Sequence, residues 1–322
     1  MNSAHEMGMY YYRTKHYDLM KTHLSQDLSN SQSMYKLAEY YQTIEKNYAL
    51  AKKYYLIAIE LGHSGAMCSL AEYYQNIEKD YDLMMKYYLM AIELINDDAM
   101  FKLGYYYQTK EEFALMEKYY IKAIELGNSN AMNNLGCHLQ PDLMKEYFLM
   151  AIERNNTSAM NNLAHCYYTE KKYDLMIKYF LMAIELKNAK AMNNLGYYYE
   201  EVKDYESMEK YYLMAIDLKY PAAMYNLGSY YIDRDNDVAI KYLVMALEYN
   251  YKFDVSKLMS ILPIKEQLLL IKKYKLNFKI DCINDECGIC MNDADLFLMP
   301  RCTHRTCAEC YIQLDKCPYC RA

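Results

Sequence analysis

The sequence of 322 residues has no tryptophan, no long apolar run and no excess of basic residues. Without an apolar run of about 20 residues, no segment is expected to cross a bilayer. The start of the chain lacks a basic patch followed by an apolar stretch, so we expect no signal peptide. The 42 acidic and 36 basic residues give a net charge of −6, which argues against a broad nucleic-acid interface. These absences indicate a soluble intracellular protein of the cytoplasm or nucleus, with neither membrane nor nucleic acid as its partner.

Cysteine is sparse over most of the chain and crowded in one part. Seven of the eleven cysteines fall within residues 287–322. In a reducing compartment, paired cysteines are more often metal ligands than disulfides. Hydrophobic residues make up 53% of the chain, so the remainder has enough apolar surface to form a folded core.

The part of the chain before residue 252 is built from one repeated unit. The dipeptide Ala-Met recurs about every 32 residues, and a fixed period of about 20 to 50 residues is typical of a solenoid. A Ser-Met at Ser33 extends the series toward the start of the chain, and a degenerate copy begins near Ser3. About eight copies are therefore expected. The alanines of the dipeptide are Ala66, Ala99, Ala131, Ala159, Ala191 and Ala223.

Each copy has two halves with the apolar spacing of a helix, joined by a short polar turn. In one second half, the residues expected to share a face are Tyr205, Met208, Tyr212, Ala215 and Ile216. Glycine recurs inside the first half, where it destabilises a helix by about 1 kcal/mol relative to alanine. We therefore expect close helix approach at these glycines. They are Gly104, Gly136, Gly196 and Gly228.

One copy, residues 131–158, lacks four residues between its two halves and is called the short copy below. Pro141 begins its second half, and proline suits the first position of a helix. We expect the deletion to be confined to the turn between two helices.

The stretches NLGYYY and YYLMA resemble the tetratricopeptide repeat family and its Sel-like relatives, although the period of about 32 residues departs from the family's 34 or so. The matching residues are Leu195, Gly196 and Tyr199 in the first helix, and Tyr212 and Ala215 in the second. The resemblance implies an all-α solenoid of stacked antiparallel helix pairs over residues 1–251. Its concave surface, lined by first helices, would hold a protein substrate or peptide.

One asparagine recurs in four successive copies, at Asn134, Asn162, Asn194 and Asn226. In some family members, asparagines along the groove hold a peptide backbone, since an amide both donates and accepts hydrogen bonds. The resemblance therefore implies a substrate groove at these residues. The alternative, which we favour, is that each asparagine hydrogen-bonds a neighbouring turn.

Two pairs of potential ligands, Cys137 with His138 and His165 with Cys166, lie in adjacent copies. A metal or thiol site there is one interpretation. We favour the alternative that these cysteines, like Cys68, are small buried side chains.

Residues 252–281 follow the repeats and are interpreted as capping helices and a linker, because the end of a solenoid needs cover. Apolar residues keep helical spacing beyond Pro263. The alternative is a basic amphipathic membrane helix. Its basic residues would be Lys265, Lys272, Lys273, Lys275 and Lys279.

The cysteine-rich segment contains eight potential zinc ligands in four pairs. They are Cys287 with Cys290, Cys302 with His304, Cys307 with Cys310, and Cys317 with Cys320. Two residues between cysteines let both thiolates reach one ion, and four ligands form a closed tetrahedral site. Eight ligands therefore predict two structural zinc ions (Zn²⁺), which would stabilise a segment too small for a large core. Cys282 fits neither site by its spacing.

The order of three cysteines, one histidine and four cysteines resembles the RING finger of ubiquitin ligases, over residues 282–322. A PHD-type finger would place its histidine later. The resemblance implies a small cross-brace domain in which the ligand pairs interleave. One zinc would be held by Cys287, Cys290, Cys307 and Cys310, and the other by Cys302, His304, Cys317 and Cys320.

RING ligases bind a ubiquitin-conjugating enzyme on a shallow apolar patch, which Ile289, Leu314 and Pro318 match here. Many relatives use tryptophan near Leu314, and this chain has none. Arg321 matches the linchpin arginine that contacts both the conjugating enzyme and its ubiquitin, a role suited to a guanidinium fork. The resemblance implies a ligase with no nucleophile of its own, which orients the charged enzyme toward a substrate lysine.

Two alternatives remain at this point. The first alternative to a ligase is a non-catalytic scaffold that uses a structural zinc finger for assembly. The second is a nucleic-acid-binding zinc protein, which the acidic net charge argues against. Repeats rich in tyrosine and asparagine beside a RING also resemble proteins of large DNA viruses of amoebae. For a viral protein, the expected location is the cytoplasm of the host cell.

Overall fold

The computed structural model describes residues 3–262, 264–275, 283–286, 293–298 and 305–307. The chain forms two compact units, Met1–Glu170 and Lys171–Ala322. The first unit contains α1 (Ala4–Arg13), α2 (Tyr17–Leu24), α3 (Ser31–Thr43), α4 (Tyr48–Glu60), α5 (Ser64–Tyr73), the π-helix η1 (Tyr74–Glu78), α6 (Tyr81–Glu93), α7 (Asp97–Thr109), α8 (Phe113–Glu125), α9 (Ser129–Gly136), α10 (Pro141–Ile152) and α11 (Thr157–Thr169). The second unit contains α12 (Tyr173–Glu185), α13 (Ala189–Glu201), α14 (Tyr205–Asp217), α15 (Pro221–Tyr231), α16 (Asn236–Glu248), α17 (Ser256–Ile261), α18 (Ile264–Tyr274), β1 (Ile283–Glu286), β2 (Asp293–Leu298) and β3 (Arg305–Cys307).

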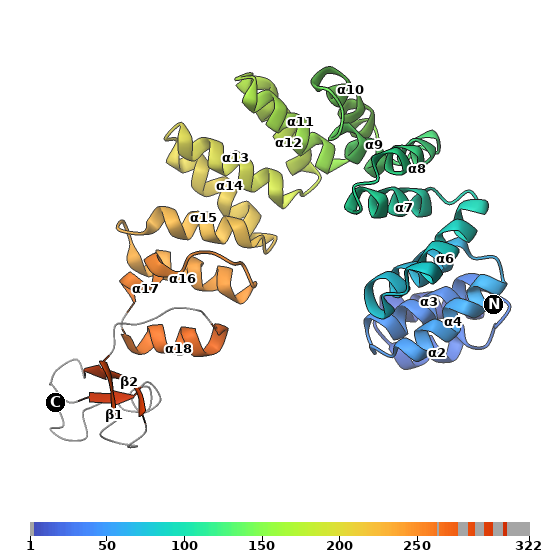
Figure 1. Cartoon of the computed structure of the whole chain (residues 1–322), viewed down its shortest axis with the longest axis horizontal. Helices are drawn as coiled ribbons and strands as arrows, with labels where there is room; N and C mark the ends of the chain where they lie inside the picture. The colour runs from blue at the N-terminus through green and yellow to red at the C-terminus, as the bar shows by residue number, and fades with distance from the viewer. Residues whose placement is uncertain (1–2, 263, 276–282, 287–292, 299–304, 308–322) are drawn as a thin grey trace. The chain divides into compact units, whose positions relative to one another are not determined.

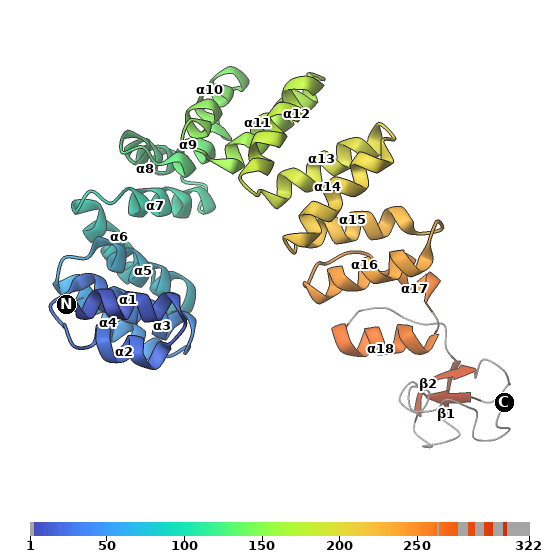
Figure 2. The same cartoon turned by 180° about the vertical axis from the view of Figure 1, so that it is seen from behind.

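Within each unit, consecutive helices pack as hairpins that stack in chain order (Figures 1 and 2). In the first unit α3 packs on α4 and α7 packs on α8, and α4 and α8 each contact the helix that follows. In the second unit α13 packs on α14 and α15 packs on α16. First helices of successive pairs also touch, α7 with α9 and α13 with α15. The predicted stack of antiparallel helix pairs is confirmed.

Asparagine begins most of the first helices. The side chains of Asn30, Asn96, Asn128, Asn156 and Asn188 each accept a hydrogen bond from the backbone N–H three residues later. In four of these helices that N–H belongs to the alanine of the Ala-Met dipeptide, whose side chain is fully buried. Such a side-chain cap satisfies a backbone donor that has no partner inside the helix. The dipeptide therefore marks the start of each first helix.

Helix α14 contains the residues that were expected to share one face of a second helix. Met208, Tyr212 and Ala215 are fully buried and Ile216 is nearly so. Tyr205, which was expected to share this face, is 43% exposed. As the first residue of α14, Tyr205 instead contacts Tyr230 of the next first helix, with ring centroids 5.3 Å apart.

The recurring glycines lie where the two helices of a pair meet. A Cβ atom on Gly104 would lie 2.7 Å from Cδ1 of Tyr120, and one on Gly196 would lie 2.8 Å from Cδ1 of Tyr212. The close approach predicted for these glycines is confirmed. The equivalent residue of α11 is Ala164, whose side chain is fully buried, so this place in the repeat also accepts a methyl group.

The short copy differs from its neighbours in its first helix. Helix α9 has 8 residues, whereas α7 and α11 each have 13. Residues 137–140 form the connection to α10, which starts at Pro141 as predicted. The prediction that the deletion affects only the turn was wrong. A helix connection needs a few residues, so the end of the first helix is unwound to supply them.

Helices α17 and α18 follow the last helix pair. Leu258 and Met259 of α17 are buried in one cluster with Leu243 of α16, and Ile271 of α18 packs against it. These contacts agree with a capping role, in which α17 and α18 cover the end of the repeat array. The domain boundaries at residues 251 and 281 remain predictions. None of the helices in the described part of the chain is both long and apolar enough to cross a membrane.

Candidate functional site

The cysteine-rich segment contains a three-stranded antiparallel sheet in the order β1-β2-β3. Ile283 of β1 pairs with Leu296 of β2, and Leu296 pairs on its other side with Cys307 of β3. The Cys287–Cys290 pair falls in the connection from β1 to β2, and Cys302 and His304 fall in the connection from β2 to β3. In sequence, two predicted ligand pairs therefore fall between consecutive strands of this sheet.

Most of the predicted finger residues lie outside the described residues. Cys307 is the last residue of β3. The other predicted ligands there are Cys287, Cys290, Cys302, His304, Cys310, Cys317 and Cys320, and the other predicted contact residues are Ile289, Leu314, Pro318 and Arg321. Seven thiolates and one imidazole are the donors that structural zinc prefers, so the donor set fits the metal. The assignment of each ligand remains a prediction.

The four predicted groove asparagines are half-buried and hydrogen-bond to residues of the repeats. Asn162 Nδ2 donates to Asn133 Oδ1 at 2.9 Å, and Asn226 Nδ2 donates to Asn193 Oδ1 at 3.0 Å. The acceptor in each case is the first asparagine of the Asn-Asn dipeptide in the preceding copy. The amide donors therefore tie one first helix to the next, rather than to a neighbouring turn.

Asn134 and Asn194 lie at the same position of their helices. Asn134 Nδ2 donates to the hydroxyl of Tyr120 at 3.3 Å, and Asn194 Oδ1 accepts from Asn193 Nδ2 at 3.5 Å. A peptide would compete with these bonds. The groove at these asparagines remains a prediction.

A second row of asparagines was missed by the sequence analysis. Asn133, Asn161 and Asn193 are buried, with at most 8% of their surface exposed. Buried amides need hydrogen-bond partners, and the bonds to the next copy provide them for Asn133 and Asn193. The sequence feature that could have identified these buried asparagines is the Asn-Asn dipeptide, which recurs in three successive copies.

The cysteines of the repeats have different surroundings. Cys68 is 2% exposed, as predicted for a core side chain, and burial raises the pKa of its thiol to about 12. Cys137 is exposed, so its assignment as a buried side chain was wrong, whereas Cys166 is half-buried with a thiol pKa raised by burial. Within the described residues, no group of three or more His, Cys, Asp or Glu side chains is arranged to hold a metal ion.

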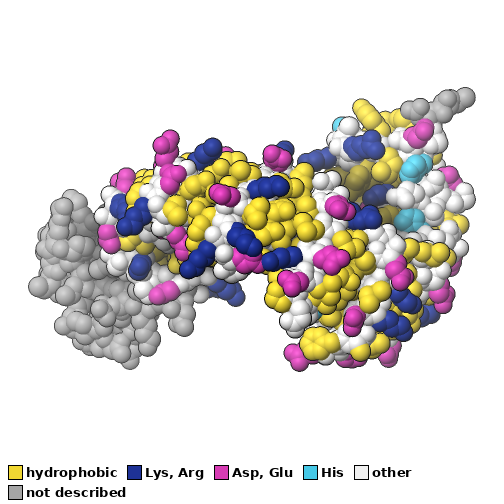
Figure 3. Space-filling view, turned by 90° about the horizontal axis from the view of Figure 1, so that it is seen from above, with side chains coloured by type: hydrophobic (Ala, Val, Ile, Leu, Met, Phe, Trp, Pro, Cys, Tyr) yellow, Lys and Arg dark blue, Asp and Glu magenta, His cyan; other side chains and the backbone are white. Residues whose placement is uncertain are grey.

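The surface of the repeats mixes charge with apolar side chains. On the face shown in Figure 3, lysine and arginine side chains are interspersed with aspartate and glutamate, and apolar side chains lie between them. Leucines that cap the second helices contribute to the exposed apolar surface, each 41–50% exposed. They are Leu61, Leu94 and Leu126 in the first unit, and Leu186 and Leu218 in the second.

Solved structures share the arrangement of the repeats. A protective antigen of uropathogenic Escherichia coli with an SLR fold is 20% identical, with a TM-score of 0.58, over 88% of this chain and 73% of its own. A Sel1 repeat protein from Oxalobacter formigenes is 23% identical, with a TM-score of 0.54, over 67% of this chain and 97% of its own. The chain therefore has a Sel1-like and tetratricopeptide-like helical repeat fold.

Residues 283–322 match the family model described as zinc finger, C3HC4 type (RING finger). The chain thus carries a RING-type zinc finger next to its helical repeats. No curated protein matches the sequence of this chain.

Proposed function

We propose that this protein is a RING-type ubiquitin ligase. Its repeats recruit a protein substrate, and its zinc finger binds a ubiquitin-conjugating enzyme that carries ubiquitin. The observation that carries the proposal is the complete set of eight zinc ligands within the RING-type match at residues 283–322. Its proposed location is the cytoplasm or nucleus.

Two zinc ions would hold the finger in shape. Cys287, Cys290, Cys307 and Cys310 would hold the first ion, and Cys302, His304, Cys317 and Cys320 the second. Bound zinc supplies folding free energy to a small domain, and a closed four-ligand site leaves no position for a reacting water. The finger therefore acts by binding and orientation.

The conjugating enzyme binds the apolar side chains of Ile289, Leu314 and Pro318. Arg321 then donates hydrogen bonds to the enzyme and to its ubiquitin at once, because a guanidinium has several donors in one plane. Holding the ubiquitin thioester in one orientation raises its rate of reaction with a substrate lysine. No residue of this chain forms a covalent intermediate.

The repeats offer surface for a protein substrate. The exposed leucines at the ends of second helices form apolar sites of the kind that protein partners cover. Along the first helices, Oδ1 of Asn162 and Asn226 accepts no hydrogen bond from the residues that the structure describes. These oxygens are proposed to accept from the backbone N–H groups of a bound peptide.

Ubiquitin discharge tests the ligase proposal. The zinc-loaded full chain is added to a panel of ubiquitin-charged conjugating enzymes, with free lysine as acceptor. We expect faster discharge with at least one enzyme, and a loss of roughly tenfold or more in Arg321→Ala and in Ile289→Ala. Arg301→Ala, which removes a positive charge elsewhere in the finger, is the control and should retain activity. No discharge from a folded, zinc-loaded chain would instead indicate a non-catalytic scaffold.

A further inference from the structure

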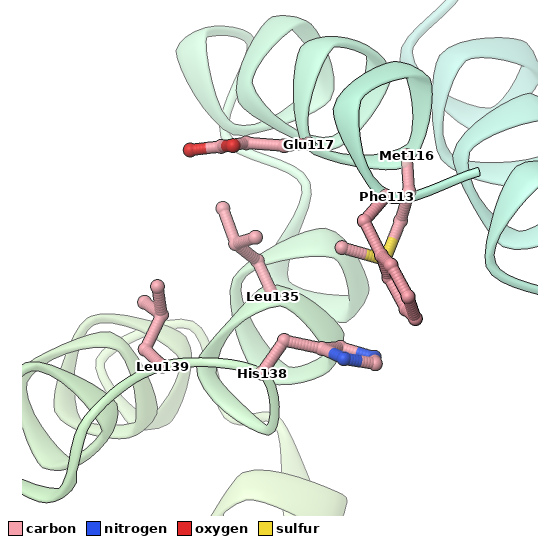
Figure 4. Close-up of a pocket in the computed structure, with 6 residues that line it drawn as sticks. All are labelled: Phe113, Met116, Glu117, Leu135, His138 and Leu139. Carbon is pink, nitrogen blue, oxygen red and sulfur yellow. The ribbon is translucent and has the colours of Figure 1, made fainter. Parts of the chain in front are cut away.

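The shortened helix α9 leaves a hollow of about 350 Å³ beside α8. It is lined by Phe113, Met116 and Glu117 of α8, Leu135 of α9, and His138 and Leu139 of the following connection. Glu117 and Leu139 lie on one side of the hollow, and Phe113 and His138 lie on the other (Figure 4). Met116 and Leu135 are almost fully buried, whereas Phe113 is 55% exposed. The hollow is therefore lined by four apolar side chains together with one carboxylate and one imidazole.

Other copies show what normally occupies this place. Glu117 is the fifth residue of α8, and the fifth residues of α14 and α6 are Glu209 and Met85. The Tyr231 hydroxyl donates to Glu209 Oε1 at 2.9 Å, and the Tyr107 hydroxyl lies 3.9 Å from Met85 Sδ. Both tyrosines come from the last turns of the first helices that follow. A tyrosine hydroxyl thus meets the fifth residue in each of these copies.

Tyrosine also covers this position where the fifth residue is lysine. The Nζ of Lys52 lies 4.7 Å from the ring centroid of Tyr74, and the Nζ of Lys145 lies 5.7 Å from that of Tyr167. Both tyrosines occupy the same place in the repeat as Tyr107. The fold therefore places a tyrosine ring against the fifth residue in copies where that residue is glutamate, methionine or lysine.

The short copy lacks this tyrosine. Leu139 stands at its place in the sequence and has no hydroxyl. Within the described part of the chain, the exposed Glu117 side chain has no hydrogen-bond or ion-pair partner. Tyr147 has no ring contact there either, whereas its equivalent Tyr119 stacks on Tyr107 with centroids 5.6 Å apart. Neither Glu117 nor Tyr147 therefore meets a tyrosine ring in this copy; Glu117 is exposed, and Tyr147 packs at the edge of the core cluster that contains Met116 and Leu135.

We propose that this hollow binds a tyrosine side chain of a partner protein. The phenol ring packs against Leu135, Leu139 and Phe113, and its hydroxyl donates to the Glu117 carboxylate, as Tyr231 donates to Glu209. Tyrosine suits such an anchor because its ring is rigid and apolar while its hydroxyl is polar. The inference rests on the proposed role of the repeats in binding a protein, and it names the chemistry of the residue recognised.

The Met116 methyl group reports occupation of the hollow. The full chain is labelled with ¹³C at its methionine methyl groups, and the signal of Met116 is assigned with Met116→Leu. N-acetyltyrosinamide is then titrated, with N-acetylphenylalaninamide and N-acetyllysinamide as comparisons. We expect a saturable shift of the Met116 signal, with the tyrosine probe binding roughly tenfold more tightly than the phenylalanine probe.

Three variants make the test specific. Glu117→Leu should remove the preference for tyrosine over phenylalanine, because the acceptor is gone. Leu139→Tyr should abolish binding of every probe, because the chain then supplies its own ring. Glu209→Leu is the matched control, since Tyr231 already covers that position, and should leave probe binding at Met116 unchanged.

An unshifted Met116 signal, equal affinity for the tyrosine and phenylalanine probes, or tighter binding of the lysine probe would each overturn the proposal. Ubiquitin discharge from free lysine does not involve the hollow. A failure of the ligase proposal would be seen in the discharge assay, and a failure of the tyrosine proposal would be seen in the titration. The two failures are therefore distinguishable.

Discussion

At the scale of single residues, the main chemical effect of the repeat is that it buries tyrosine side chains. Tyr88 is 1% exposed and Tyr35 is half-buried. Burial raises the pKa of both phenols, that of Tyr35 to about 12. Phe148 and Phe180 occupy the place of Tyr88 in two other copies, so the core requires the ring and tolerates loss of the hydroxyl.

This burial predicts a loss of stability at alkaline pH. The folded state keeps the phenols protonated. Their contribution to the free energy of unfolding is therefore complete below about pH 10, the pKa of a phenol in the unfolded chain, and is lost as the pH rises above that value. Each well-buried tyrosine contributes up to about 1.4 kcal/mol per pH unit. Urea unfolding followed by circular dichroism should therefore give a falling free energy of unfolding between pH 9 and pH 11.

Tyr88→Phe isolates the effect of one buried phenol. At pH 7 we expect its free energy of unfolding to lie within about 1 kcal/mol of the wild type, because its hydroxyl makes only a long hydrogen bond, 3.5 Å, to Gln75. Between pH 9 and pH 11 the variant should lose less stability than the wild type. An unchanged alkaline slope would contradict this account.

At the scale of elements, the caps of the first helices also join neighbouring copies. Asn156 accepts from the N–H of Ala159 at 3.0 Å, and its amide donates to Asn130 Oδ1 at 2.9 Å and to Ser129 Oγ at 3.2 Å. One side chain thus begins α11 and ties it to α9. Asn47, by comparison, caps α4 by accepting from the N–H of Leu50 at 3.1 Å.

Asn156→Ala should destabilise the chain by about 2–3 kcal/mol, because it removes a cap together with two hydrogen bonds to the preceding copy. Asn47→Ala is the matched control and should lower the free energy of unfolding by only about 1 kcal/mol. Urea denaturation of both variants measures the difference. Equal losses would mean that the bonds from Asn156 to α9 contribute nothing.

At the scale of the whole molecule, the chain combines helical repeats with a zinc finger that depends on metal. Structural zinc contributes on the order of 10 kcal/mol to folding of such fingers, whereas a repeat is stabilised by its neighbours. Removing zinc with a chelator should therefore unfold residues 282–322 and leave most of the helical circular dichroism at 222 nm. Collapse of the helical signal together with zinc release would contradict this two-part organisation.

Metal content provides the control for that experiment. Two zinc ions per chain are expected by elemental analysis. Cys282→Ser should keep both, because Cys282 has no place in the predicted ligand set, whereas Cys310→Ser should lower the content. Loss of zinc in Cys282→Ser would require a different assignment of ligands.

The sequence alone determined the repeat, its helix pairs and the RING-type finger. The regular return of Ala-Met and the fixed ligand spacings are linear patterns, and local geometry preserves them in the fold. The buried glycines were predicted for the same reason, since their recurrence at one place in the repeat leaves few explanations besides close packing.

Only the tertiary structure decided which side chains meet between copies. Tyr205 has helical spacing for a buried face but begins its helix, so it lies at the edge and contacts Tyr230 of the next copy. Deletion of four residues unwound the end of α9 and uncovered Glu117, because a connection must still span the two helices. Contacts between residues one repeat apart depend on how copies stack, and linear spacing within one copy does not contain that information.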